Sequence, residues 1–160
     1  MMKSALLTAS SILLVAACSN QTVDVEERNK ELARGFYEDL WFTDNTDAYN
    51  QYVADTYVVH DVGDRKGVTE DAIEQKKIAD MFHSFGNVTG EIDYQIADGD
   101  KVATRWFVYL EPSAEAQQMG MTEVDGVAII NVFRFNAEGK IVEFWNHRHD
   151  VELPRPPERQ

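Results

Sequence analysis

Cysteine is almost absent from this sequence, and its scarcity excludes several kinds of chemistry at once. The only cysteine, Cys18, stands near the beginning of a chain of 160 residues. The rest of the chain therefore has no disulfide, no thiolate nucleophile and no thiolate metal site. Its stability must come from the packing of a core.

Basic residues are also few, because 15 Lys and Arg stand against 28 Asp and Glu, for a net charge of −13. Nucleic acids and anionic lipid surfaces are bound through basic patches, so this balance argues against both kinds of partner. The glycines are scattered and form neither a phosphate-binding loop nor a Gly-x-Ser-x-Gly nucleophile elbow.

The one extended apolar run lies at the N-terminus. Residues 1–17 join a basic start at Lys3 to a small apolar stretch, which is too short to span a bilayer. The stretch ends in Leu-Val-Ala-Ala before Cys18 and so resembles the lipobox of a bacterial lipoprotein signal peptide. The resemblance implies cleavage before Cys18, lipidation of its thiol, and a lipid anchor in a membrane of the cell envelope, facing the periplasm or the exterior. An ordinary secretory signal is the alternative.

Beyond a short tether at residues 18–23, the chain has the length and composition of one globular domain. It is 44% hydrophobic and contains three Trp, six Tyr and eight Phe. Amphipathic patterns predict helices at residues 24–42, 47–53 and 69–85, with Asp24 and Thr69 as N-caps. A β-branched run predicts a short strand that ends at His60. A proline-rich tail, residues 153–160, cannot continue a sheet.

Four longer strands follow the helices. Asp98-Gly99-Asp100 separates two β-rich runs, residues 88–97 and 101–111, as a hairpin turn would. Residues 112–120 read as a loop, and residues 122–150 read as a second, longer hairpin that turns at Gly139. Helices segregated from antiparallel strands predict an α+β fold.

Several segments in this order resemble the SnoaL-like polyketide cyclase group of the nuclear transport factor 2-like superfamily. The matching segments are Phe36-Tyr37-Glu38, residues 57–61 (YVVHD), residues 97–106 (ADGDKVATRW), residues 132–135 (VFRF) and residues 139–145 (GKIVEFW). The resemblance covers residues 24–152. It implies a cone, in which a curved antiparallel sheet and three helices enclose a pocket, and it implies pairing of sheets into homodimers.

The cyclases of this group close a ring by aldol chemistry without a cofactor. Their acid–base Asp, near the end of the last strand, matches Asn146 here, and a His on the preceding strand matches Asn131. An amide has no titratable proton in the useful range, so neither residue can act as a general base. The family's pocket position after the short strand matches His60, with Asp61 beside it.

The residues themselves suggest a candidate site. Asp61 can orient the His60 imidazole for proton transfer, although loop capping explains the same pair. Asn131 and Asn146 lie on paired arms, where their amides can hold a ligand oxygen. Arg148 shares the strand parity of Asn146 and can add a positive charge, with a surface ion pair as the alternative.

Two aromatic residues, Trp106 and Tyr109, are candidate ligand contacts, although core packing also explains them. His147 and His149 share one face of a strand but lack a third ligand, so we expect no metal and no cofactor.

Two functional hypotheses follow. The first is a pocket for a small organic molecule, with cofactor-free proton transfer through His60 as its chemistry. The alternative is a non-catalytic ligand-binding or dimeric assembly domain.

Overall fold

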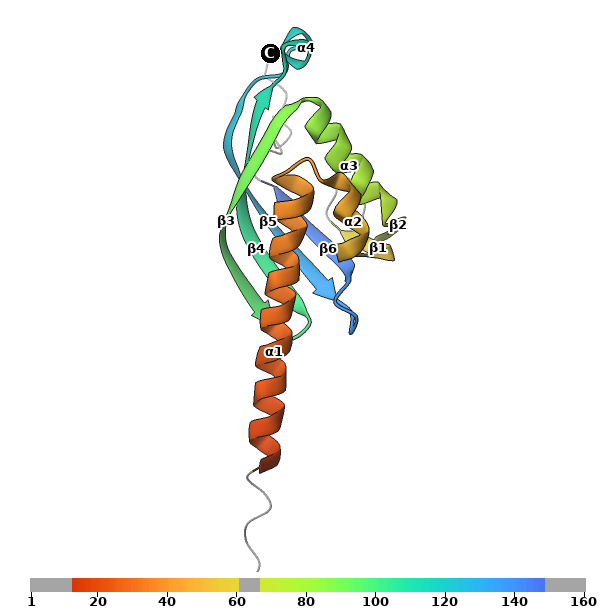
Figure 1. Ribbon diagram of the computed structural model, residues 1–160, viewed down its shortest axis with the longest axis vertical. Helices are drawn as coiled ribbons and strands as arrows, with labels where there is room; N and C mark the ends of the chain where they lie inside the picture. Colours follow the sequence, from red (N-terminus) through yellow and green to blue (C-terminus); the bar gives the residue numbers. More distant parts are fainter. Residues whose placement is uncertain (1–12, 61–66, 149–160) are drawn as a thin grey trace, which may run out of the picture.

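The computed structural model describes residues 13–60 and 67–148, with the backbone alone at residues 13–23 and 148. Figure 1 shows the elements in chain order. These are α1 (Leu13–Gly35), the π-helix η1 (Phe36–Trp41), the 3₁₀ turn η2 (Thr46–Ala48), α2 (Tyr49–Tyr52), β1 (Val53–His60), β2 (Val68–Asp71), α3 (Ile73–Ser84), β3 (Gly86–Asp98), β4 (Lys101–Pro112), α4 (Ala114–Gln118), β5 (Val124–Phe135) and β6 (Ile141–Arg148).

The strands form one sheet in the order β2-β1-β6-β5-β4-β3. Neighbouring strands are antiparallel except β1 and β6, which run parallel. The sheet curves strongly, and α1, α2 and α3 lie against its concave side (Figure 1). The predicted α+β cone is therefore confirmed.

Both predicted hairpin turns are confirmed, and each depends on a glycine. Gly99 joins β3 to β4 with φ 59°, and Gly139 precedes β6 with φ 79°. Residues other than glycine rarely adopt this left-handed backbone conformation, so glycine allows both turns to form without backbone strain. The register that follows pairs Asn131 with Asn146 across the second hairpin.

The core lies between the concave face and the helices. Strand alternation directs Val102, Phe133 and Phe135 inward, where each is at most 3% exposed. Phe36 and Tyr37 of η1 contact the Phe133 ring at centroid distances of 5.0 and 5.7 Å. Burying one such side chain contributes about 1.5–3 kcal/mol, so this aromatic cluster holds the first helical segment on the sheet.

The first helix does not end in a regular turn. Phe42 N donates to Tyr37 O at 2.8 Å, an i→i−5 bond, and η1 therefore holds one more residue per turn than an α-helix. Phe36, Tyr37 and Leu40 are all buried within this single turn.

Three predicted boundaries are wrong. Asp24 is no N-cap, because α1 begins at Leu13 and contains neither Gly nor Pro before Gly35 to interrupt it. Its N-terminal half, which includes the predicted tether, extends beyond the sheet (Figure 1). Thr69 is no N-cap either: Val68–Asp71 pairs with Thr56–Val59 as a strand.

The third correction concerns residues 112–120, which contain the short helix α4. Ser113 caps it, because its Oγ accepts from Ala116 N at 3.2 Å. Within the described residues, no helix combines the length and the apolar character needed to cross a membrane.

Candidate functional site

A cavity of about 260 Å³ lies between the concave face of the sheet and the helices η1 and α3. Phe36, Trp41, Ile78 and Phe82 are part of its helical wall, and the strands supply the remainder. The lining is apolar except for two indoles and a few polar side chains. These polar side chains are Tyr57, Glu70, Gln75, Asn131 and Asn146. Such a lining suits an apolar molecule that is oriented by a few polar contacts.

Asn131 is the centre of the first polar group, and it is only 3% exposed. Its Oδ1 accepts from Trp106 Nε1 at 2.8 Å and from the Tyr37 hydroxyl at 3.0 Å. Its Nδ2 donates to Asn146 Oδ1 at 2.9 Å. Burial raises the pKa of Tyr37 well above its ordinary value, against a hydrogen bond with Thr104 that lowers it, so the phenol stays neutral and keeps its proton.

Trp106 fixes the orientation of both amides, because an indole N–H can only donate. The Asn131 atom that faces it must therefore be oxygen, which directs Nδ2 toward Asn146. Asn146 must in turn present its oxygen to that Nδ2. Its own NH₂ group, with two donor protons, is not used in this network, and Asn146 lines the cavity.

A second polar group lies on the other side of the cavity. Tyr57 is 2% exposed, and its hydroxyl donates to Glu70 Oε2 at 3.2 Å while accepting from Gln75 Nε2 at 3.0 Å. Burial is the largest cause that raises the pKa of Tyr57, so the phenol is a lasting donor to the Glu70 carboxylate. Among the described residues, Glu70 is the only carboxylate in the lining.

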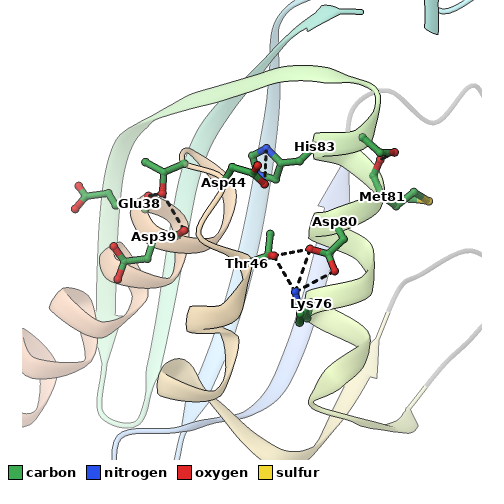
Figure 2. Close-up of polar contacts among 10 residues, drawn as sticks. Glu38, Asp39, Asp44, Thr46, Lys76, Asp80, Met81 and His83 are labelled. Carbon is green, nitrogen blue, oxygen red and sulfur yellow. Dashed lines mark hydrogen bonds and ion pairs between the residues drawn. The ribbon is translucent and has the colours of Figure 1, made fainter. Parts of the chain in front are cut away.

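Polar contacts on its outer side fasten α3, which carries Ile78 and Phe82, to the segment that follows η1. Thr46 Oγ1 and Lys76 Nζ both donate to Asp80, and Lys76 also reaches Thr46 at 3.1 Å (Figure 2). The hydrogen bond from Thr46, followed by that from Lys76, lowers the pKa of Asp80. These contacts hold the helical wall in place over the cavity.

His60 lies on the opposite, outer face of the sheet, which corrects its predicted position in the pocket. Val59 lines the cavity, and the next residue on a strand faces the other way. His60 Nε2 lies 2.7 Å from Glu143 Oε1, and Arg134 Nε donates to Glu143 Oε2 at 2.6 Å. The imidazole stacks on the Trp145 ring at 4.8 Å.

The aromatic candidates separate in the same way. Trp106 lines the cavity, and its contact with a ligand stays a prediction. Tyr109 does not line it: Trp106, Val108 and Leu110 line the cavity at every second position of β4, so Tyr109 faces the other side, where its hydroxyl donates to Glu91 at 3.0 Å on an exposed surface. Tyr109 is therefore corrected to an outer-face residue.

Three remaining candidates stay untested. Asp61 and His149 lie outside the described residues, and of Arg148 only the backbone is described. The Arg148 backbone pairs with Ile129, a residue that lines the cavity. This register is consistent with the predicted parity of Arg148 and Asn146, and the place of the Arg148 side chain in the cavity stays a prediction.

Sequence reasoning missed Glu70, Tyr57 and Gln75. The segment Val68–Asp71 has the sequence Val-Thr-Glu-Asp, which is typical of the capped start of a helix. This pattern hid an edge strand, and it is this strand that places Glu70 opposite Tyr57. Alternation along β1 was the available signal, because Tyr57 and Val59 have the same parity and therefore face the same side of the sheet.

We expect the buried amide network to be energetically coupled. Asn131→Leu removes the shared acceptor of Tyr37 and Trp106 and should lower the free energy of unfolding by about 2–5 kcal/mol. Urea unfolding of a double-mutant cycle with Tyr37→Phe measures the coupling. Tyr37→Phe should cost about 1 kcal/mol alone and almost nothing beside Asn131→Leu, whereas additive costs would contradict the network.

The outer-face cluster predicts a pH dependence. Burial acts to raise the pKa of Glu143, but hydrogen bonds from Arg134 and His60 bring this pKa below its ordinary value of 4.5. A carboxylate whose pKa is lower in the folded state contributes its full stabilisation above its unfolded-state pKa. This stabilisation is lost as the pH falls through the folded-state pKa. Glu143→Gln should therefore cost about 1–3 kcal/mol at pH 7 and progressively less below pH 4.5.

Urea unfolding at several pH values measures this difference, and Glu138→Gln, on the exposed turn before β6, is the matched control. A cost for Glu143→Gln that stays constant from pH 7 to about pH 3 would show that the carboxylate charge is not what stabilises the cluster.

Comparisons with known proteins agree with this geometry. A model of the SnoaL-like polyketide cyclase family matches residues 31–155. A solved structure from Acidithiobacillus ferrooxidans, named as a polyketide cyclase, is 22% identical with a TM-score of 0.64, over 77% of this chain and 89% of its own. IdmH of Streptomyces antibioticus, also named as a polyketide cyclase, is 20% identical with a TM-score of 0.62, over 76% and 92%.

An LEH-like epoxide hydrolase of M. tuberculosis is 16% identical with a TM-score of 0.58, over 76% of this chain and 82% of its own. No curated protein matches the chain by sequence. Identities this low show a shared fold alone, but the family model spans most of the chain. The chain therefore belongs to the SnoaL-like polyketide cyclase family.

Proposed function

We propose that this protein binds a small, mainly apolar organic molecule in its cavity and holds a carbonyl oxygen of that molecule with the Asn146 amide. The single observation that carries the proposal is the fixed orientation of Asn146. Asn131 occupies its oxygen at 2.9 Å, and its NH₂ group then faces an otherwise apolar lining. Asn146 is half-buried, and a ligand acceptor in the cavity would satisfy this donor pair.

Binding is better supported than proton transfer through His60. The imidazole is engaged with Glu143 on the outer face, and the two positions that match the cyclases' acid–base residues are amides. Two similar structures are named as polyketide cyclases and one as an epoxide hydrolase, which shows that the fold serves several reactions. The ligand-binding alternative predicted from the sequence is thus the one we retain.

The test compares two probes on the purified full-length chain. 2-Acetylnaphthalene offers a carbonyl on an apolar ring system, and 2-ethylnaphthalene has the same shape without the acceptor. Asn146→Asp keeps the oxygen that Asn131 needs but removes the donor. We expect Asn146→Asp to raise the Kd of the ketone about tenfold, because roughly one hydrogen bond is lost and the new carboxylate repels the carbonyl oxygen. The Kd of 2-ethylnaphthalene should not change.

Fluorescence titration gives both Kd values, with Asn50→Asp on the exposed side of α2 as the control for added charge. Equal ketone affinity for the wild type and Asn146→Asp would contradict the proposed role of Asn146. Absence of any binding, together with native mass spectrometry that finds no retained ligand, would remove the binding function.

We also propose that the chain is a lipoprotein anchored through Cys18. The support is the sequence around this cysteine, with a basic start and a small apolar run before it. The wild-type chain, expressed in a bacterial host, should lose residues 1–17 and gain the mass of a lipid at Cys18, as measured by mass spectrometry. It should also partition into the detergent-rich phase in a detergent–water phase separation. Cys18→Ala should show none of these three changes, and a wild-type protein without added lipid mass would refute the anchor.

A homodimer through the sheet stays a prediction. The outer face carries Tyr94 and Ile96, which are 48% and 61% exposed and could be covered by a second copy. The native mass spectra of the binding experiment report this state directly, and a monomer at micromolar concentration would count against it.

A further inference from the structure

Helix α1 connects the domain to the proposed lipidation site without a break. It runs from Leu13 to Gly35, so Cys18 belongs to its helical backbone. Glu26, which contacts the sheet, follows Cys18 by eight residues, about 12 Å of helix at 1.5 Å per residue. The segment predicted as a short tether is therefore helical, and it continues directly into the folded domain.

Polar contacts fix the C-terminal half of α1 to both hairpin turns. Glu26 Oε1 accepts from Gly99 N at 2.9 Å, and Arg28 Nη1 donates to Ala137 O at 3.1 Å. Further along the helix, Ala33 is fully buried. These contacts hold α1 in one direction relative to the sheet, and its N-terminal half extends a helix that is already nucleated. Helical segments of this kind act as semi-rigid spacers.

The cavity lies in the half of the sheet that is farther from these turns. On β4 it is lined by Trp106, Val108 and Leu110, whereas Val102, close to the Gly99 turn, is packed in the core. Trp106 follows Gly99 by seven residues, about 23 Å of strand at 3.3 Å per residue. Figure 1 shows α4, which follows β4, at the opposite end of the domain from the N-terminal half of α1.

The end of the domain that carries the two turns is acidic. Asp98 and Glu138 are exposed there, one beside each turn. An anionic lipid surface repels such groups, so this end has no electrostatic reason to lie down on a bilayer.

From these observations we infer that α1 is a rigid spacer between the bilayer and the domain, with the hairpin turns toward the lipid and the cavity half facing the aqueous compartment. The inference rests on the proposed lipid anchor at Cys18 and goes beyond it, because a flexible tether would let the domain turn any face toward the lipid. The cavity is thereby presented to molecules in water and not to molecules dissolved in the bilayer.

Energy transfer to the bilayer tests this orientation on the lipidated chain. A donor dye is attached through Glu138→Cys, at the turn end, or through Met119→Cys, beside α4, where Met119 is 73% exposed. Cys18 carries the lipid and does not react with the dye. The acceptor dyes are attached to lipid head groups in phosphatidylcholine vesicles that contain phosphatidylglycerol. We expect about threefold more efficient transfer from position 138 than from position 119, because α1 and the length of the sheet separate the two heights.

A break in the spacer should remove this difference. Replacing Gln21, Thr22 and Val23 together by glycine interrupts the helix between Cys18 and the domain and lets the domain tilt. The ratio of the two transfer efficiencies should then fall to about 1.5. Replacing the same three residues by alanine keeps the helix and is the matched control, in which the ratio should stay at about threefold. A ratio near one in the wild type, or a ratio that the glycines leave unchanged, overturns the rigid spacer.

The spacer and the anchor fail in different ways. A chain without lipid mass at Cys18 removes the anchor and the spacer with it. A chain that carries the lipid and binds vesicles, but shows equal transfer from both positions, removes only the spacer. Ketone binding in the cavity is decided by its own titration in either case.

Discussion

The hydrogen bond from Trp106 Nε1 to Asn131 is the interaction on which the character of this site depends. An indole can donate but never accept, and it has no alternative orientation that would satisfy an amide nitrogen. The Trp106 donor fixes the orientation of the Asn131 amide, and Asn131 in turn fixes that of Asn146. One buried donor therefore decides which end of the Asn146 amide faces the cavity. Because every atom in this relay is buried or half-buried, reversing it would leave polar groups unpaired.

The fold supplies the conditions for this relay. Asn131 and Asn146 face each other because the second hairpin turns at Gly139, and Tyr37 reaches Asn131 because η1 lies against Phe133. The same aromatic cluster that stabilises the domain therefore also positions the polar group. Stability and recognition are linked here, and changes at the network are expected to affect both.

The sequence predicted the fold class, both hairpins and the pairing of the two asparagines, because turn glycines and alternating β-rich runs are local signals. It failed where a signal depended on context. His60 next to Asp61 suggested a proton-transfer pair, but strand parity turned His60 outward toward Glu143. Glu70 was hidden because an edge strand and the first turn of a helix can share the same few polar residues.

The extra residue in η1 gives the first helical segment a particular response to changes in chain length. Deleting one residue between Phe36 and Trp41 would allow an ordinary α-helical turn, which normally improves a helix. A π-turn uses one more residue than an α-helical turn to complete the same rotation, so the residues before the deletion, including the fully buried Ala33, would keep nearly the same face toward the sheet. The irregular turn is therefore the place where this helical segment can lose one residue without changing which side of the preceding helix is buried.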